Sequence, residues 1–567
     1  MAHLKDFRGI EGTDFFEQDK GFQTLLADLL TEDEQAQIFS SLHQCAKLAA
    51  GRWHRLACEA SRNENLPKIV KVDRAGNPQE QIDFGAYTPQ LRREAAEFGL
   101  FTKARNELHK FAMIYYSAHN GEASINCGIS CTDGLIRSIE AKGSEFLREF
   151  YLPKLLSSDT PFAGAQFVTE RTGGSDVGAI ETLAVKDDNG NWTISGEKWF
   201  CSNPDEYFLV AAKFDTKAQG TAGVATFLVP RSLPDGNLNR ISFTRLKDKL
   251  GTRSLPTAEM KFDNAMAFPI GELHEGFKTL MNYVINASRI HNAINACAFT
   301  HRAFLEARNY ARQREAFGQT LLASPLIQET LITLLERAWR NRILTFRLIA
   351  LIDKNGIAPE DPEQAMWQRF LTNLAKYRTA LPLVDSMREA ILILGGNGIV
   401  EDFTILSRLF RDAMIIETWE GPPNTLCLQI MRDAAKSNLF ARFQTEISEV
   451  LEGWHKDFLS HTRKLVEEEF KKLNEALANN ASNNNWLVAN ARRIVDAMGG
   501  LIEIAWLAQL ALRRRESDAT AALLVSIAAR NLFDKENFNH PALEVVAQQG
   551  LALVEEERIV SAPLASI

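Results

Sequence analysis

The sequence has no run of about eighteen uncharged apolar residues, the length that a membrane-spanning helix needs. Its opening segment, residues 1–20, mixes acids with bases and lacks the apolar core of a signal peptide. We therefore expect a protein that is neither exported nor membrane-spanning, and we expect it in the cytoplasm.

Paired cysteines are also absent. The seven cysteines are scattered and odd in number, and none forms a C-x-x-C pair, so we expect reduced thiols and no metal site. Cys127 and Cys131 lie one helical turn apart, but no His or further Cys accompanies them. We expect this pair to be small buried residues and not metal ligands.

The chain has no excess of positive charge, because 72 acids outnumber 64 Lys and Arg and give a net charge of -8. The bases are spread along the chain, which argues against nucleic acid as a partner. The run Arg513-Arg514-Arg515 lies in a tail whose acids slightly outnumber its bases, so we interpret it as a solvated helix face.

What the sequence does contain is enough apolar material for several packed domains, with 45% apolar residues in a chain of 567. A helical pattern fills residues 1–160, and alternating patterns typical of a β domain fill residues 161–270. Long helical periods return in residues 271–435, as in a bundle, and residues 436–567 form a further helical region.

Individual segments support this division. TLAVKDDNGNWTISGEKWF alternates in two runs around Asp188-Asn189-Gly190, which is typical of a hairpin, and YFLVAAKF, GVATFLVP and LPTAEMKF predict further strands. One helix face is predicted at Leu331, Leu334, Leu335, Ala338 and Trp339, and another at Ile494, Met498, Leu501, Ala505, Ala508 and Leu512. Pro325, Pro359, Pro362 and Pro382 separate the bundle helices, and the Asn-rich run 479–485 predicts a flexible loop in the tail.

The first segment that suggests chemistry is 166–177, QFVTERTGGSDV. Its paired glycines allow backbone N–H groups to approach an anion or a flat ring, and the hydroxyls add donors. An ordinary structural turn explains a Gly-Gly pair equally well.

A second segment, 196–203 (GEKWFCSN), ends a predicted strand with aromatic residues and a hydroxyl. This composition suits packing against a planar cofactor, although such residues are more often core.

A third segment, 311–318 (ARQREAFG), closes a predicted helix. Arg followed by Gly is typical of a favourable helix C-terminus, and a guanidinium at this place also suits a pyrophosphate. The residues alone do not decide between these interpretations.

The fourth region contains Leu394-Gly395-Gly396-Asn397-Gly398, then Arg411-Asp412, and then the run from Ile416 to Asn424. In this run Glu420 stands between Trp419 and a Gly-Pro-Pro turn. A partly apolar site of this kind raises the pKa of a carboxyl group toward the range that is useful for proton abstraction. A surface acid is the alternative.

The four segments in this order, with the helix, strand, helix layout between them, resemble the acyl-CoA dehydrogenase family over about residues 85–435. Within the family the AidB-like, alkylation-response branch is the most similar. The stretches LPKIVKVDRAGNPQEQIDFG, VPRSLPDGNLNR, RLKDKLGTRS and TWEGPPNTLCLQIMRD carry this likeness.

The resemblance implies a mostly α fold with a central β domain: an N-terminal helical domain, a β-sandwich or barrel, a four-helix bundle and here an additional helical C-terminal region. It also implies a bound FAD and a homotetramer or homodimer. Residues implied to contact the flavin are Gln166, Val168, Thr169, Gly174, Ser175, Phe200, Cys201, Ser202, Trp419, Gly421 and Asn424. Residues implied to hold its pyrophosphate and adenosine part are Arg314, Phe317, Gly395 and Gly396, partly across a subunit interface.

For the substrate, the resemblance implies an acyl-CoA contacted by Ser175, Arg289, Glu420 and Gly421, with Glu420 as the base that removes the α-proton. The β-hydride then passes to the flavin, and an electron-transfer flavoprotein is the expected acceptor. Two alternatives are an acyl-CoA oxidase, which also carries extra C-terminal helices, and an AidB-like, DNA-associated flavoprotein that dehydrogenates poorly.

The sequence departs from the family pattern at a few positions. Arg171-Thr172 replaces the usual Pro-Gly, Leu392 stands where a glutamine often contacts the adenosine part, and Pro422 replaces a hydroxyl residue. The last two changes remove polar contacts to FAD.

Overall fold

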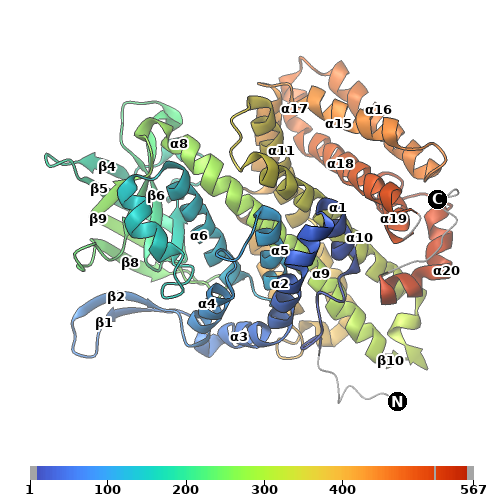
Figure 1. Cartoon of the computed structure of the whole chain (residues 1–567), viewed down its shortest axis with the longest axis horizontal. Coiled ribbons are helices and arrows are strands. Elements are labelled where there is room, and N and C mark those ends of the chain that lie inside the picture. The colour runs from blue at the N-terminus through green and yellow to red at the C-terminus, as the bar shows by residue number, and fades with distance from the viewer. Residues whose placement is uncertain (1–8, 516–518, 558–567) are drawn as a thin grey trace. The chain divides into compact units, whose positions relative to one another are not determined.

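Residues 9–515 and 519–557 are described by a computed structural model (Figure 1). Their contacts divide the chain into two units, and neither unit is continuous in sequence. Unit 1 comprises Met1–Gly51, Glu107–Gly121 and Asn292–Ile567, and unit 2 comprises Arg52–Asn106 and Glu122–His291. The division into four successive domains stays a prediction. Residues 1–8 of the opening segment lie outside the described residues.

A seven-stranded sheet forms the centre of unit 2. Its strands are β3 (Gly164–Phe167), β4 (Leu183–Lys186), β5 (Trp192–Ser202), β6 (Tyr207–Lys213), β7 (Val224–Pro230), β8 (Ile241–Leu246) and β9 (Thr257–Pro269). β4 and β5 form the predicted hairpin, and Gly190 in its turn has a φ of 85°. β6, β7 and β9 match the three other predicted strands, whereas the sequence patterns do not predict β3 and β8.

The sheet closes on itself, because β6 pairs with β7 as well as with β4. β6 is buried on both faces. Phe208, Val210 and Ala212 belong to one apolar cluster of the strands. The intervening Tyr207, Leu209 and Ala211 belong to a second cluster, which includes residues of helix α6 (Ala123–Lys142). This period of two is what a strand imposes on its side chains, and it explains why β6 reads as an unbroken apolar run.

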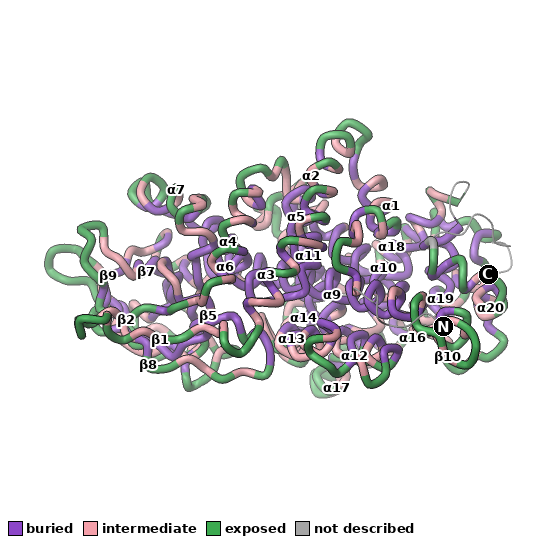
Figure 2. The backbone as a smooth tube through the Cα atoms, turned by 90° about the horizontal axis from the view of Figure 1, so that it is seen from below, coloured by how far each residue is buried: buried purple, intermediate pink, exposed green. Residues whose placement is uncertain are grey.

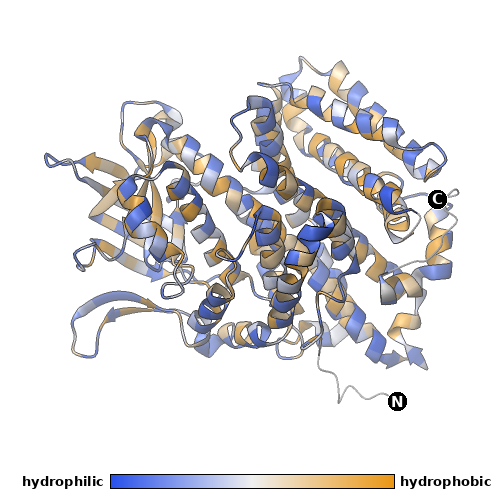
Figure 3. Cartoon of the chain, in the orientation of Figure 1, coloured by the Kyte–Doolittle hydropathy of each residue, from blue (hydrophilic) through white to orange (hydrophobic). Residues whose placement is uncertain are grey.

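The remaining elements of unit 2 are mainly helical. They are α3 (Arg52–Ala60), α4 (Tyr87–Phe98), α6, α7 (Leu152–Leu155), α8 (Gly276–Thr279) and the first residues of α9 (Asn286–Gln313). A hairpin of β1 (Lys68–Val72) and β2 (Pro78–Asp83) interrupts the helical pattern expected up to residue 160. Asp73 makes its turn, accepting hydrogen bonds from the backbone N–H groups of Ala75 and Asn77 at 2.8 and 2.9 Å. β2 is largely polar (Figure 3) and most of its residues are not buried, so it lacks the apolar alternation that marks a strand in a sequence.

The described part of unit 1 is helical except for a small hairpin of β10 (Glu315–Ala316) and β11 (Gln319–Thr320). Its first helices are α1 (Lys20–Leu29), α2 (Glu32–Ala50) and α5 (Glu107–Ala118). The bundle helices are most of α9, α10 (Pro325–Asn355), α11 (Pro362–Ala380), α12 (Leu383–Leu394), α13 (Leu406–Thr418) and α14 (Pro423–Ala434). Pro325 and Pro362 occupy the first turns of α10 and α11, and the predicted apolar face of α10 is buried (Figure 2).

The tail of unit 1 adds further helices that pack on the bundle. They are α15 (Leu439–Gly453), α16 (Ser460–Asn479), α17 (Asn484–Ala489), α18 (Ala491–Arg514), α19 (Thr520–Phe533) and α20 (Pro541–Glu556). The Asn-rich run contains the loop between α16 and α17, and the predicted apolar face of α18 is buried apart from the partly exposed Leu512. On α18, Glu503 accepts hydrogen bonds from Arg340 at 2.8 Å and from Arg378 at 2.7 Å. This buried ion pairing connects the tail to α10 and α11.

One helix, α18, is long and apolar enough to cross a membrane by length and composition. The most apolar part of α18 is 83% buried inside the structure. This is the behaviour of a core helix, and the finding is weak evidence for a membrane span.

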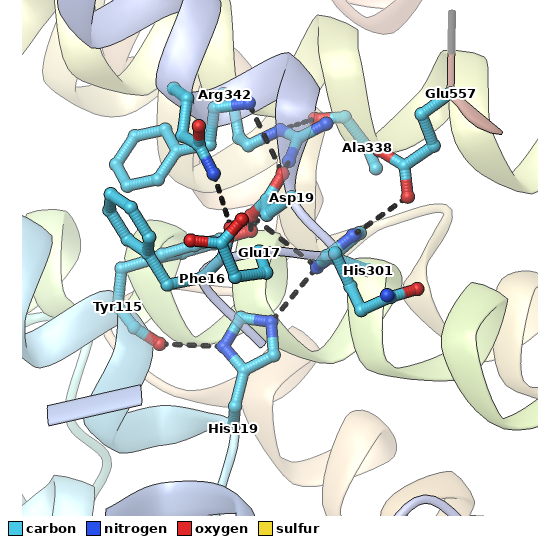
Figure 4. A network of polar contacts seen from close by, with 12 residues as sticks. Phe16, Glu17, Asp19, Tyr115, His119, His301, Ala338, Arg342 and Glu557 are labelled. Atoms are coloured by element: carbon cyan, nitrogen blue, oxygen red, sulfur yellow. Dashed lines mark hydrogen bonds and ion pairs between the residues drawn. The ribbon is translucent and has the colours of Figure 1, made fainter. Parts of the chain in front are cut away.

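A buried polar network lies in the core of unit 1 (Figure 4). Asp19 caps α1 by accepting from the Phe22 N–H at 3.1 Å, and it also accepts from the Tyr115 hydroxyl at 2.7 Å and pairs with Arg342. Burial alone would raise the pKa of Asp19, but Arg342, His301 and the Tyr115 hydroxyl together hold this pKa below its usual range. The network therefore keeps a carboxylate ionised in the core.

Packing around α1 gives a test of this core. A Cβ on Gly21 would lie 2.5 Å from the Trp339 ring, whereas a Cβ on Gly453, at the end of α15, would meet nothing within 4 Å. We expect Gly21→Ala to destabilise the fold by about 1–3 kcal/mol through overpacking. Gly453→Ala should be neutral or stabilise by up to about 1 kcal/mol, because Ala is the better helix former. Urea unfolding of both variants checks this, and equal midpoints would contradict the packing described.

Candidate active site

In unit 2 the first segment follows β3 and turns back at Glu170–Gly173. The backbone N–H of Glu170 donates to the Gly173 carbonyl at 3.3 Å, and the Gly173 N–H donates to the Glu170 carbonyl at 3.1 Å. Gly173 has a φ of 128°, and a Cβ on Gly174 would lie 2.4 Å from Thr169 Oγ1. Both positions therefore require glycine, and the turn exposes Ser175 to solvent.

A buried ion pair joins the second segment to this turn. Lys198 Nζ lies 2.6 Å from Glu170 Oε1 and donates to the Val168 carbonyl at 3.2 Å. Glu170 also accepts from the backbone N–H groups of Glu181 and Thr182 at 2.5 and 3.1 Å. Burial raises the pKa of Glu170, but Lys198 and these donors lower it below its usual value. The two segments that the sequence singled out are thus held together by a charged pair that it did not predict.

Two aromatic residues lie near the end of β5. Trp199 donates its backbone N–H to the Thr169 carbonyl at 2.9 Å, and its ring lies under Lys247 Nζ at 3.5 Å. Phe200 is 53% exposed. An exposed phenyl ring beside a glycine turn gives a flat ligand an apolar face.

The other predicted residues of unit 2 occupy different environments. Gln166 donates to Ser288 Oγ at 2.9 Å, and Ser202 Oγ lies 3.0 Å from Thr257 Oγ1. Cys201 is fully buried, and this burial raises the pKa of its thiol. Arg289, on the first turn of α9, is 3% exposed. The proposed roles of these residues stay predictions.

In unit 1 the third segment does not end as a capped helix. α9 ends at Gln313, and Phe317-Gly318 form the turn between β10 and β11, with φ values of 53° and 82°. The capping interpretation of Gly318 is therefore wrong. Phe317 combines a left-handed backbone with a fully exposed ring, and such strain on a non-glycine residue is typical of functional positions. Arg314, just before the hairpin, is exposed.

The glycines of the fourth region lie at the end of α12. Gly395 has a φ of 60°, and a Cβ on Gly395 or Gly396 would meet nothing within 4 Å. Asn397 Nδ2 donates to the Tyr310 hydroxyl at 3.1 Å, which connects this loop to the last turns of α9. The structure thus brings the third segment and the glycine loop together.

Glu420 lies in a tight turn between α13 and α14. It is partly buried, and its φ of 57° is followed by a φ of 106° at Gly421. Lys376 of α11, 1% exposed, donates to the Glu417 carbonyl at 2.7 Å and to the Gly421 carbonyl at 2.9 Å. A buried ammonium therefore fixes the backbone on both sides of the carboxylate. Trp419 is partly buried and Asn424 is exposed in this region.

Two buried lysines thus support the candidate site, and sequence reasoning missed both. Lys198 stands inside a predicted strand, and Lys376 lies in the middle of an apolar helix, in TNLAKYRTAL. The sequence did contain a signal for both, because each lysine stands at a position where the periodicity predicts a buried side chain. A buried lysine needs partners, and such partners could have been sought.

These residues fit a flavin dinucleotide by their chemistry. A diphosphate needs backbone N–H groups without side chains in the way, and the open positions Gly173 in unit 2 and Gly395 and Gly396 in unit 1 supply such backbone. A flat ring system needs exposed aromatic surface, and Phe200 and Phe317 supply it. Leu392, where the family often has glutamine, is 61% exposed and provides no polar contact.

Two clusters of described residues have the composition of metal ligands, Asp19–His301–Glu557 and His461–Asp534–His540. In the first, Arg342 and Arg308 already neutralise the two carboxylates. In the second, His540 Nδ1 accepts from the Ala542 N–H at 3.2 Å, so the neutral ring keeps its proton on Nε2. Both clusters are explained as polar networks.

Comparison with known proteins decides the family. Two models match the chain: "Acyl-CoA dehydrogenase, middle domain" at residues 165–265 and "Acyl-CoA dehydrogenase, C-terminal domain" at residues 274–435. Cyclohexane-1-carbonyl-CoA dehydrogenase of Syntrophus aciditrophicus is 30% identical over 379 residues, which cover 63% of this chain and 91% of that protein. The chain belongs to the acyl-CoA dehydrogenase family. Membership confirms the expected fold class, an FAD-dependent oxidoreductase and FAD as its cofactor.

Two further relatives are similar to this chain, one in sequence and one in fold. AidB of Escherichia coli strain K12 is 34% identical over 267 residues, which cover 47% of each chain. The Caenorhabditis elegans protein ACDH-11, solved with C11-CoA, superposes with a TM-score of 0.83 at 24% identity and covers 95% of both chains. The tail beyond residue 435 is thus part of a fold already seen in this family.

The Glu170–Lys198 pair predicts a specific defect. Lys198→Met leaves a buried carboxylate without its ammonium, and we expect a loss of about 3–5 kcal/mol in stability. The wild-type contribution itself should fade as the pH falls through the pKa of Glu170 in the folded protein. Lys261→Met is the control, because Lys261 pairs with Glu197 in an exposed position at 3.3 Å and should cost no more than about 1 kcal/mol. Thermal unfolding and flavin retention check this, and equal behaviour of the two variants would contradict it.

Proposed function

We propose that this chain catalyses the FAD-dependent α,β-dehydrogenation of an acyl-CoA thioester, with Glu420 as the base. The observation that carries the proposal is the turn of Glu420: a non-glycine residue with a φ of 57°, held on both sides by the buried Lys376. A strained backbone persists only where the surroundings fix it, and such positions cluster at active sites. The acyl-CoA substrate of the Syntrophus relative supports the same reaction class.

The chemistry assigned to this chain is a proton transfer. A thioester carbonyl acidifies the hydrogens on its α-carbon, and polarisation of its oxygen by N–H donors acidifies them further. The Glu420 carboxylate accepts the α-proton on one of its oxygens, and FAD supplies the acceptor for the β-hydride. Lys376 contributes by fixing the backbone from which the carboxylate extends.

Binding is assigned to the residues already predicted from the family pattern. The Gly173-Gly174 turn and Ser175 are proposed to line the flavin and the CoA, and Arg289 to contact the CoA. Arg314, Phe317, Gly395 and Gly396 are proposed to hold the pyrophosphate and adenosine part, with Phe317 available to a neighbouring subunit because its ring is fully exposed. An electron-transfer flavoprotein as acceptor and a homo-oligomeric state belong to the same proposal.

DNA association, the AidB-like alternative, finds no support in the charges of the tail. Along α16 the bases pair with acids of the same helix: Arg463 with Glu467, Lys464 with Glu468, Lys471 with Glu475 and Lys472 with Glu469. In the Arg513–Arg515 run, Arg513 pairs with Asp28 at 2.5 Å. A phosphate backbone needs cations that are not already neutralised.

Glu420→Gln tests the base. The amide preserves the shape but accepts no proton, so we expect wild-type flavin content and acyl-CoA binding with a loss of turnover of about 10³-fold or more. Glu417→Gln, three residues earlier at the end of α13, should retain activity. Steady-state rates with an artificial electron acceptor check both variants, and substantial turnover by Glu420→Gln would show that another group removes the proton.

The acceptor is tested with the same enzyme. A dehydrogenase should form little hydrogen peroxide in air, and an oxidase should form one molecule of peroxide for each acyl-CoA consumed. Stoichiometric peroxide without any added acceptor would replace the dehydrogenase proposal with the oxidase alternative.

A further inference from the structure

A cavity of about 780 Å³ lies within unit 1, away from every residue proposed for catalysis or cofactor binding. Its walls come from α1, α10 and α11 and from α15 and α18 of the tail. Cavities of this size hold small organic molecules. Neither the flavin nor the acyl-CoA proposal uses it.

The cavity contains a cation without a carboxylate partner. Arg347 of α10 donates to Gln509 Oε1 at 2.5 Å, and its guanidinium lies over the Trp506 ring, 5.3 Å from the centroid. None of the described residues places a carboxylate within ion-pair distance of it. Burial lowers the pKa of Arg347 to about 10, because the guanidinium is removed from water and the nearby carboxylates offset this cost only in part.

The other guanidinium groups of the cavity are already neutralised. Arg513 donates from Nε to Asp28 Oδ1 at 2.6 Å and from Nη2 to Asp28 Oδ2 at 2.5 Å. Arg442 donates to Glu446 at 2.9 Å, and Glu446 also accepts from the Trp506 Nε1 at 2.8 Å. Among the described residues, Arg347 is therefore the guanidinium of this cavity that has no carboxylate within ion-pair distance. Lys354, Asp361 and Glu363 line the cavity too, but their side chains are exposed to solvent, where water screens them.

The lining also contains apolar and aromatic surface, beside the polar Asn355, Gln364 and Gln368. Leu29, Ala350 and Leu351 supply aliphatic surface, and Arg442 lies over the Trp367 ring at 4.8 Å. Stacked guanidinium and indole groups favour flat, polarisable ligands.

We propose that this cavity binds a small organic monocarboxylate with an aromatic body, and that Arg347 pairs with its carboxylate. The planar guanidinium matches a carboxylate in a bidentate geometry. Asp28 and Glu446 also line the cavity, and they would repel a doubly charged phosphate more strongly than a monocarboxylate.

Calorimetric titration of the full-length, flavin-loaded protein tests the proposal. The probes are phenylacetate, 3-phenylpropionate and 4-phenylbutyrate, with 3-phenylpropionamide as the neutral analogue. We expect at least one of the acids to bind, and we expect the amide to bind about tenfold or more weakly, because it leaves Arg347 unpaired. Arg347→Gln should abolish this preference for the acid, whereas Arg369→Gln, on the outer face of α11 and paired with Asp433, should keep it.

The thermal stability of the ligand-free variants separates a binding role from a structural one. An Arg held for a ligand should be dispensable to the fold, so Arg347→Gln should unfold at or above the wild-type temperature. Its flavin content and acyl-CoA turnover should also equal those of the wild type, which keeps this test independent of the proposed function. The proposal is overturned if none of the acids binds at millimolar concentration, if the amide binds as well as its acid, if phenyl phosphate binds more tightly than the acids, or if Arg347→Gln unfolds below the wild-type temperature.

Discussion

A single buried ammonium, that of Lys376, fixes the turn on which the proposed chemistry depends. Lys376 reaches from α11 to the carbonyl groups of Glu417 and Gly421, and it thereby fixes a backbone that Glu420 would not adopt by its own preference. The end of α13 is fixed from α9 as well, since Asn292 donates to the Ile416 carbonyl at 3.0 Å. Because both donors come from packed helices, the position of the carboxylate is set by the bundle core and not by the loop itself.

Unit 2 also contains a buried lysine, Lys198, that fixes a loop of the candidate site. Lys198 extends from β5 and pairs with Glu170. This ion pair joins the segment that contains Gly173 and Gly174 to β5. In each unit a buried lysine donates to at least one backbone carbonyl group in or beside a turn of the candidate site, and these contacts offset part of the desolvation cost of its charge. In the tail, buried charges are paired as well: Glu503 of α18 binds Arg340 of α10 and Arg378 of α11.

The sequence predicted those parts of the structure that repeat or that carry a strong local signal. The apolar faces of α10 and α18, the hairpin at Gly190 and the strands β6, β7 and β9 follow from periodicity and turn chemistry. The β1–β2 hairpin was not predicted because β2 carries a single buried apolar residue, Ile82, and therefore shows no alternation. The role of Gly318 stayed open, because a glycine after an arginine is equally consistent with a helix cap and a hairpin turn. Lys376 and Lys198 lie more than twenty positions in sequence from the groups that they bind, and no local pattern encodes such pairs.

The central claim is that Glu420 removes a proton from an acyl-CoA while the flavin accepts a hydride. Anaerobic addition of acyl-CoAs of graded chain length to the purified, yellow protein tests it directly, with the flavin absorbance followed at each addition. The account predicts bleaching by at least one chain length in the wild type and none in Glu420→Gln. A flavin that stays oxidised with every acyl-CoA, or that bleaches equally in the variant, would contradict it.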